Sequence, residues 1–380
     1  MASLNRLHDR SRWGMPRLSV SRRVAPRDGD RRAPCTRRRL HPPTWTANGI
    51  RRTLDARDED PTEQSYMART TFSRTMAFER LPFDSESHIA DIRMFQQVAF
   101  GAVYLIDDDR KAIIETGTSW DVDRILEATR AFGLRGTDID CVIVSHIHLD
   151  HAGGAGFLLA SMPRAKVFVH ERGFKHLADP TKLLASAQAA LGPDEAEEFG
   201  TMRPIPADRL MSVKDGDTLD LGKHELRFLD SPGHAPHELT ILDTRTRCVY
   251  TGDAAGLYFP GDEILMPITP APAFDLEKNL RTFERLLALQ PRALLFSHYG
   301  PHLRPKEAIA AQMDLYPNWA RIVRDRLPPV GEEGVLGELF DMSCRAAKKY
   351  PRDFLERRIR TSIRGLADYH RRMERAAPQG

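Results

Sequence analysis

The sequence predicts an α/β protein in which two β-sheets pack face to face and helices cover both outer sides. Two observations lead to this prediction. Short apolar segments separated by turn residues recur near residues 88–117 and 218–250, a pattern typical of β-meanders. Amphipathic segments with helical spacing lie between these two groups and after the second. A chain of 380 residues has room for such a domain and for further segments.

The first 80 residues differ in composition from the rest of the chain. They hold 18 Arg, no Lys and 9 acidic residues, a balance of +9 that leaves −6 for residues 81–380. Arginine clusters alternate with prolines, so we expect residues 1–80 to form a disordered extension. Three interpretations are open: a nucleic-acid-binding or targeting arm, a transit peptide, which shares the arginines but not the acidic residues, and a dispensable extension or an upstream start-site artefact. Met67 and Met76, just before the first segment that resembles folded protein, favour the last.

The composition of the whole chain narrows the class of protein. The cysteines are far apart and form no C-x-x-C pair, which argues against a disulfide scaffold: Cys35, Cys141, Cys248 and Cys344. No apolar run is long enough to span a membrane, and no secretory signal is evident, so we expect a cytoplasmic protein. Residues 81–380 carry a mildly negative net charge, which does not favour binding of nucleic acid. We therefore expect a small-molecule substrate, with a homodimer left open.

The first half of the folded region alternates strands and helices. Strands are expected near 88–95, 102–106, 111–117, 142–144 and 166–170. A helix with Thr118 or Ser119 as its N-cap runs to Phe132 and ends at Gly133. A short helix is expected near 156–161, and residues 171–200 are expected to form a helical pair over one edge of the sheet.

The second half repeats the pattern and then becomes helical. Strands are expected near 218–221, 224–229, 239–242, 248–250 and 293–296, with a helix at 275–289. Beyond Pro301, helices are expected near 306–326, 332–348 and 352–374, separated by Pro328-Pro329 and by Pro351. Their amphipathic spacing favours a packed C-terminal helical appendage, residues 303–380, over a membrane-surface element.

The segment 141–154 is the densest in metal-binding side chains. After the apolar strand 142–144 come four such residues within six positions: His146, His148, Asp150 and His151. A loop leaving a strand can turn the first two toward one point and the last two toward a second, which suits two adjacent cations. Three later strands also end in such residues: His234, Asp253 and His298. One strand-end histidine is more often structural, but three such ends beside this loop favour a metal site.

These motifs resemble those of the metallo-β-lactamase-fold hydrolases over about residues 90–302. They are Ser145-His-Ile-His-Leu-Asp-His151, Ser231-Pro-Gly-His234, Thr251-Gly-Asp253 and Ser297-His298. The resemblance implies an αβ/βα four-layer sandwich, with residues 81–302 as the catalytic domain and the metals at one edge. It also implies that His146, His148 and His234 hold one metal. Asp150, His151 and His298 would hold a second, and Asp253 would bridge both.

The chemistry of these residue types agrees with such roles. Imidazole and carboxylate ligands suit two Zn²⁺ ions and leave Fe or Mn open, because no thiolate is present. Two cations can share a hydroxide that attacks at neutral pH. Asp150 is the candidate for orienting the water or protonating the leaving group, and Tyr299 for donating to an oxyanion, with packing as the alternative for Tyr299. His237 is a candidate partner of a ligand, whereas Glu238 replaces a histidine of many relatives, which leaves its role open.

The leading function is hydrolysis of a small ester, thioester or lactone by a dinuclear metal site. Within the resembled family, Asp253 argues against antibiotic-degrading lactamases, which lack a bridging aspartate there. Glyoxalase II-like thioesterases and acyl-homoserine-lactone lactonases share the full ligand set, but the glutathione-binding pattern has no clear counterpart, and Gly256 stands where lactonases often have tyrosine. The segment 267–275 is expected to rim the pocket. A phosphodiesterase or nuclease, and a non-catalytic metal-binding or regulatory protein, are the alternatives.

Overall fold

The structure is a computed structural model that describes residues 78–376. The expected disordered extension, residues 1–80, lies outside the described residues except at its end. There, Phe78–Arg80 form strand β1, which pairs with residues 88–90. The last three residues of the expected extension therefore belong to the first sheet, because their backbone groups complete its edge.

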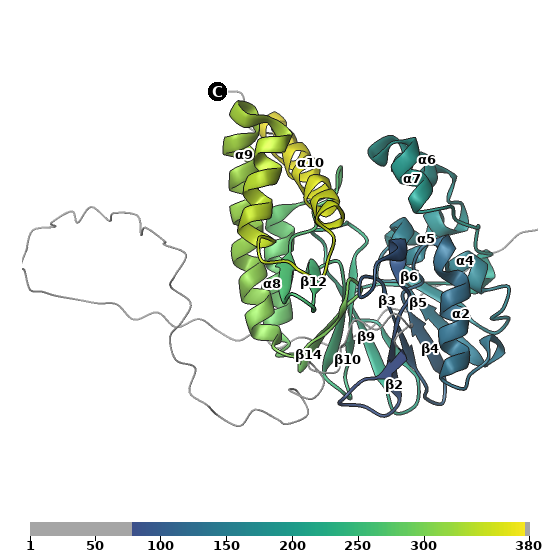
Figure 1. Ribbon diagram of the computed structural model, residues 1–380. Helices are drawn as coiled ribbons and strands as arrows, with labels where there is room; N and C mark the ends of the chain where they lie inside the picture. Colours follow the sequence, from purple (N-terminus) through teal and green to yellow (C-terminus); the bar gives the residue numbers. More distant parts are fainter. Residues whose placement is uncertain (1–77, 377–380) are drawn as a thin grey trace, which may run out of the picture. The chain divides into compact units, whose positions relative to one another are not determined.

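Two mixed sheets form the centre of the described unit (Figure 1). The first follows chain order: β1, β2 (Ser87–Asp91), β3 (Ala102–Ile106), β4 (Lys111–Ile114), β5 (Ile139–Ile143), β6 (Lys166–His170) and β7 (Leu210–Val213). Its strands are antiparallel up to β4 and parallel from β4 to β7. The expected meander is thus confirmed for β2 to β4.

The second sheet has the order β15-β14-β11-β10-β9-β8. Its strands are β8 (Thr218–Asp220), β9 (Glu225–Asp230), β10 (Leu239–Asp243), β11 (Cys248–Gly252), β14 (Ala293–Phe296) and β15 (Gly300–His302). β8 to β11 form the expected antiparallel meander, and β14 joins β11 in parallel. A separate hairpin, β12 (Leu257–Phe259) and β13 (Ile264–Met266), was not expected.

Two expected strands end earlier than their sequence suggests. The strand expected at 88–95 stops at Asp91, whose carboxylate accepts hydrogen bonds from the amides of Arg93 and Ala99 at 2.9 and 2.8 Å. These bonds close a turn that includes the 3₁₀ segment η1 (Met94–Gln96). The strand expected at 111–117 stops at Ile114, because Glu115 takes a positive φ of 72°.

Both faces of the central strands are buried, as a sandwich requires. Along β3, the side chains of Tyr104 and Val103 point to opposite faces, and the two residues belong to different hydrophobic clusters. Tyr104 meets Tyr250 of the second sheet edge to face, with ring centroids 5.1 Å apart. Val103 packs in the cluster that includes the helices. This alternation builds the αβ/βα four-layer sandwich that the sequence predicts.

Helices cover the outer side of each sheet (Figure 1). Beside the first sheet lie α2 (Val122–Ala131), α3 (Leu149–Ala152), α4 (Ala155–Leu158), α5 (Glu171–Ala178), α6 (Thr181–Leu191) and α7 (Pro193–Glu198), with the 3₁₀ segments η2 (Ser119–Asp121), η3 (Gly136–Asp138) and η4 (Ala207–Arg209). The expected cap is confirmed at Thr118, which forms a capping box with Asp121. The expected helical pair at 171–200 is instead three helices, α5 to α7.

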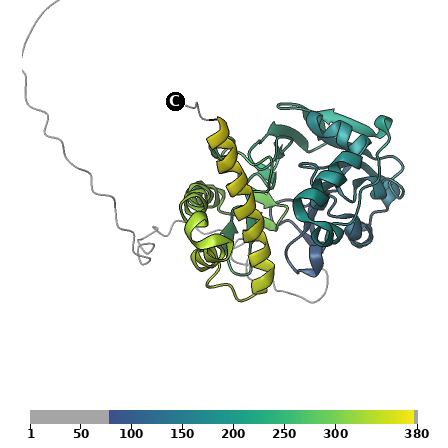
Figure 2. The same cartoon turned by 90° about the horizontal axis from the view of Figure 1, so that it is seen from above.

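The second sheet carries α8 (Leu276–Ala288), α9 (Pro305–Ser343) and α10 (Arg352–Ala376), with α10 packed along α9 (Figure 2). The break expected at Pro328-Pro329 occurs instead at Gly331, where φ is 71°. Both prolines lie in the turn before that break. Trp319 of α9 is fully buried in the cluster that also holds the outer faces of the strands. Among residues 78–376, no helix combines the length and the hydropathy needed to cross a membrane.

Helix α10 is bound closely to the segment before α8. The hydroxyl of Thr269 donates to the carbonyl of Ser362 at 2.9 Å, and the hydroxyl of Ser362 donates to the carbonyl of Pro267 at 3.0 Å. Gly365 lies so near that an added Cβ would overlap with the Thr269 carbonyl oxygen. The C-terminal helices are therefore fitted to residues 267–270 at backbone distance.

This close fit predicts opposite effects for two helical glycines. Gly365→Ala should lower the free energy of unfolding by about 1–3 kcal/mol, because the methyl group forces α10 away from Thr269. The control Gly337→Ala, in an exposed part of α9 with no atom within 4 Å of the added Cβ, should raise it by about 0.5–1 kcal/mol. Urea unfolding measures both. Equal stabilisation by the two substitutions would contradict the described contact.

Candidate metal centre

The seven expected ligands lie at one edge of the sandwich, where strands end. They follow β5 (His146, His148), sit on the one-turn helix α3 (Asp150, His151), or follow β9, β11 and β14 (His234, Asp253 and His298, respectively). β4 and β5 are parallel, as are β11 and β14. Parallel neighbours end at the same edge, which is why residues so far apart in sequence meet there.

Three histidines converge on one point. The Nε2 of His146 lies 2.9 Å from the Nδ1 of His148, and the Nε2 of His234 lies 3.0 Å from the same Nδ1. His146 and His234 are buried, whereas His148 is partly exposed and lines a cavity. Each ring therefore directs one nitrogen toward a common centre.

A second group lies beside the first. The Nε2 atoms of His151 and His298 are 3.1 Å apart, and Asp150 places its Oδ2 3.6 Å from the Nε2 of His298. The other oxygen of Asp150, Oδ1, is 4.0 Å from the Nε2 of His151. Two imidazoles and one carboxylate thus face a second common point.

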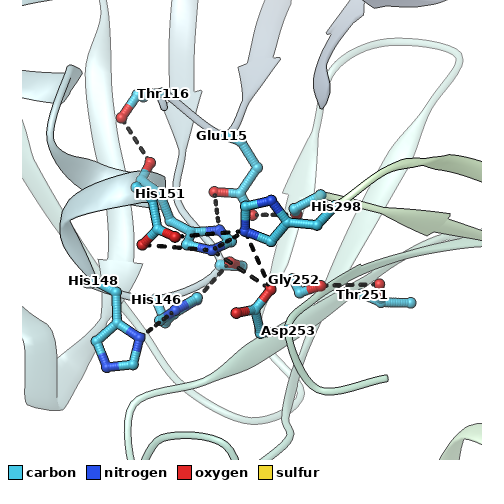
Figure 3. A network of polar contacts seen from close by, with 12 residues as sticks. Glu115, Thr116, His146, His148, His151, Thr251, Gly252, Asp253 and His298 are labelled. Carbon is cyan, nitrogen blue, oxygen red and sulfur yellow. Dashed lines mark hydrogen bonds and ion pairs between the residues drawn. The ribbon is translucent and has the colours of Figure 1, made fainter. Parts of the chain in front are cut away.

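Asp253 lies between the two groups (Figure 3). Its Oδ2 is 3.4 Å from the Nε2 of His234 in the first group. Its Oδ1 is 3.5 and 3.7 Å from the Nε2 atoms of His151 and His298 in the second. Oδ1 is buried and accepts no hydrogen bond within the described part of the chain. One carboxylate oxygen is therefore directed at each group.

Backbone carbonyls determine the tautomers of two histidines. The Nδ1 of His234 is 3.2 Å from the carbonyl oxygen of Ile268, and the Nδ1 of His298 is 2.9 Å from that of Phe100. Since a carbonyl only accepts, Nδ1 must carry the proton in both rings. The Nε2 atoms that face the centre therefore present lone pairs, as ligands do.

Two buried carboxylates stand behind two further histidines. Glu238 places Oε2 3.1 Å from the Nδ1 of His146, and Glu115 places Oε2 3.3 Å from the Nδ1 of His151. Both carboxylates are buried, and so are the histidines. Carboxylates behind imidazoles orient the rings and make them stronger ligands.

The charges of the site also fit a cation. Burial, followed by the nearness of His234, lowers the pKa of His148 to about 3, so this ring stays neutral. Burial would raise the pKa of Asp253, yet the surrounding histidines, His151 foremost, lower it below its ordinary value. Burial would likewise lower the pKa of His151, but the carboxylates around it, Asp253 foremost, raise it well above that value. The centre thus attracts positive charge, and its donors are those that divalent ions take.

Sequence reasoning missed Glu115 and left Glu238 open. Glu115 directly follows β4 with a positive φ, and Ser297 donates to its Oε1 at 2.9 Å. The available signal in the sequence was a single acidic residue, Glu115, at the end of the apolar strand that lies beside β5. Glu238 also accepts a hydrogen bond from the amide of Asp253 at 3.0 Å, so it connects two ligands.

The glycine of the Thr251-Gly-Asp253 motif has a steric role in this arrangement. Gly252 has φ +53°, and an added Cβ would overlap with the carboxylate of Glu238 and the side chain of Ser145. Only glycine combines this φ with such a close approach. The motif therefore makes room for the carboxylate behind His146 and directs Asp253 into the centre.

A cavity of about 300 Å³ opens onto the centre. Five of the expected ligands line it: His148, Asp150, His234, Asp253 and His298. The expected rim is confirmed, because Ile268 and residues 270–273 are part of the lining, as is His237. Tyr299 is buried in the core between the sheets and is not part of the described lining. Its oxyanion role stays a prediction that this placement does not favour.

The contact between Glu238 and His146 predicts a loss of metal affinity when the carboxyl group is replaced. Glu238→Gln keeps the size of the side chain but replaces the carboxyl group behind the imidazole with an amide, which is a weaker acceptor, so Zn²⁺ affinity should fall by about 10- to 100-fold. Competition with a chromophoric chelator measures the affinity. The control Glu127→Gln, at an exposed position of α2, should leave it unchanged. Equal affinities for the two variants would contradict the assigned role of Glu238.

Comparison with known proteins agrees with this geometry. Residues 97–298 match the family model of the metallo-beta-lactamase superfamily. The metallo-beta-lactamase fold-containing protein ST1585 of Sulfurisphaera tokodaii is 32% identical over 165 residues, 43% of this chain and 61% of that protein. The putative diflavin flavoprotein A 1 of Thermosynechococcus vestitus is 27% identical over 266 residues, 66% of this chain and 41% of that protein. The chain thus spans less than two thirds of either relative.

Two solved structures share the fold. That of ST1585 has a TM-score of 0.54 at 23% identity and covers 71% of this chain and 93% of that chain. That of the metallo-beta-lactamase family protein TTHA1429 from Thermus thermophilus has a TM-score of 0.55 at 20% identity, covering 79% and 93%. With the family model spanning more than half of its residues, the chain belongs to the metallo-β-lactamase superfamily.

Proposed function

We propose that this protein is a dinuclear metal-dependent hydrolase that cleaves a small ester, thioester or lactone. The observation that carries the proposal is the position of Asp253, with one carboxylate oxygen directed at each histidine group. A carboxylate shared in this way is what a pair of divalent cations requires. Imidazole and carboxylate donors suit Zn²⁺, which we propose as the metal, and they also accept Fe or Mn.

Two buried cysteines of the described part of the chain, Cys141 and Cys248, do not offer an alternative nucleophile. Burial raises the pKa of Cys141 to about 11 and that of Cys248 to about 12. Neither thiol ionises near neutral pH, and neither belongs to the described lining of the cavity. Bound divalent cations would instead supply Lewis acidity, which activates water and polarises a substrate carbonyl.

The side chains of the chain itself supply orientation and proton handling. Asp150 lines the cavity with 18% of its side chain exposed. Burial would raise its pKa, but His151 and His298 lower it below its ordinary value, so the carboxylate stays ionised. An ionised carboxylate at this position accepts a hydrogen bond from the attacking water and can take its proton. We assign Asp150 this positioning and acceptor role.

The cavity supports a small substrate. A volume of about 300 Å³ is at the low end of ligand sites, and much of the described lining is apolar, including Leu183 and Leu257. An apolar wall keeps bulk water away from the polarised carbonyl and strengthens the electrostatic interactions there. The net charge of −6 on residues 81–380 does not favour a nucleic-acid substrate.

A substrate panel tests the proposal. The purified chain should hydrolyse phenyl thioesters, phenyl esters or lactones faster than bis-aryl phosphates, measured as kcat/KM. His148→Ala should reduce turnover by about 100-fold or more, because a cavity-facing ligand is lost. The control His176→Ala, on α5 and outside the lining of this cavity, should retain turnover.

Three results would contradict the proposal, each in its own way. Preference for bis-aryl phosphates would support the phosphodiesterase alternative. Metal binding without any turnover would support a non-catalytic metal-binding protein. Full turnover by His148→Ala would exclude the proposed metal chemistry.

A further inference from the structure

Arg358 of α10 lines the same cavity as the metal centre. Its neighbour Arg357 also lines it but is neutralised by Glu198, whose two oxygens lie 3.0 Å from the Nη1 of Arg357. Within residues 78–376, Arg358 forms no ion pair, and its hydrogen bond to the protein is a long one, 3.4 Å, to the carbonyl of Phe354 in its own helix. The cavity wall thus contains a guanidinium that no ion pair of the described residues neutralises, and its N–H groups can donate into the cavity.

Aromatic rings hold this guanidinium in place. Its central carbon lies 3.8 Å from the ring centroid of Phe354, 4.6 Å from that of Phe100 and 5.1 Å from that of Phe95. Rings stacked on a guanidinium stabilise its charge through their faces and leave its N–H groups, which lie in its own plane, available to donate. The aromatic contacts therefore hold a planar donor without occupying its hydrogen-bonding edge.

The same contacts place Arg358 next to the reaction centre. Phe100, which stacks on the guanidinium, also stacks on the metal-ligand candidate His298, with centroids 4.5 Å apart and the planes inclined by 22°. A single aromatic ring thus separates the cation from the second histidine group. A substrate that reaches the centre with its scissile carbonyl can therefore contact Arg358 with a group only a few bonds away.

The energetics favour an anionic ligand at this position. Burial lowers the pKa of Arg358 to about 9, and the side chain still carries its charge at neutral pH. A cation held in an apolar wall without a counter-ion loses favourable hydration energy. A carboxylate or phosphate ligand compensates for this loss by accepting paired N–H···O hydrogen bonds. Asp150, Glu198 and Glu195 add favourable fields, but among the described residues none of them forms an ion pair with Arg358.

We propose that Arg358 is the substrate-anion site of this hydrolase, so that its substrate carries a carboxylate or phosphate-type anion a few bonds from the ester, thioester or lactone carbonyl. The inference rests on the proposed function and extends it by naming the substrate class. Arg358 acts in binding and orientation, because the bond that breaks lies at the metal centre. A carboxylate and a phosphate share the chemistry that this site would recognise: each is a compact oxyanion that accepts hydrogen bonds from two neighbouring N–H groups.

Matched substrates test this inference. The phenyl thioester of glutaric acid has a free carboxylate, and the phenyl thioester of its monomethyl ester is neutral. The wild type should prefer the acid by about 10- to 100-fold in kcat/KM, and Arg358→Met should abolish that preference. Arg358→Lys should restore only part of it, because an ammonium lacks the planar fork. The control Arg364→Met, exposed on the same helix, should retain the preference.

Binding supplies a readout that does not depend on turnover. By calorimetry on the purified protein, monomethyl glutarate should bind at least about tenfold more weakly to Arg358→Met than to wild type, whereas dimethyl glutarate should not distinguish them. A phosphonate of the same length tests the other source of the anion: tighter binding than the carboxylate would identify a phosphate-bearing substrate. Equal binding of both anions to wild type and Arg358→Met would overturn the inference.

The outcomes separate this inference from the proposed function. If wild type and Arg358→Met both hydrolyse the acid and the neutral thioester at equal rates, the anion site is refuted and the proposed hydrolase function is retained. If no thioester is hydrolysed but monomethyl glutarate binds in a way that depends on Arg358, the hydrolase function is refuted and the anion site is retained.

Discussion

The structure depends on one electrostatic constraint: lone pairs and carboxylates converge on a buried centre that only positive charge can satisfy. The backbone carbonyls of Ile268 and Phe100 hold the protons of His234 and His298 on the outward nitrogens. The Nε2 atoms of these two rings therefore face the centre as lone pairs, and the carboxylate of Asp253 lies beside them. Such an arrangement is costly unless a cation occupies the centre, so metal binding and the local fold stabilise each other.

The sandwich assembles this centre, and the C-terminal helices shape what can enter it. The ligands come from the ends of strands in both sheets, so neither sheet alone forms the site. Helix α10 contributes Arg358 to the cavity and is fitted against the rim at Thr269 through Gly365. The candidate metal centre and the wall of its cavity thus come from different layers of the same unit.

Much of the site could be predicted from the sequence, because its ligands occur as short motifs at the ends of apolar strands. The carboxylates behind them could not, since a single Glu115 or Glu238 has no spacing that distinguishes it from a surface residue. The role of Arg358 could not be predicted for a similar reason: α10 holds many arginines, and only the three-dimensional packing shows which of them line the cavity and which are paired with carboxylates. The sequence predicts a helix break at Pro328-Pro329, but the break lies at Gly331. The helix accommodates the two prolines in the turn before the break, and the glycine takes the positive φ.

The central claim is that two cations share Asp253. Anomalous X-ray scattering, recorded from crystals of the protein at the absorption edge of the bound metal, tests it most directly. The account predicts two peaks, one among His146, His148 and His234 and one among Asp150, His151 and His298, on either side of the Asp253 carboxylate. A single peak, or no peak at these residues in metal-supplemented crystals, would contradict it.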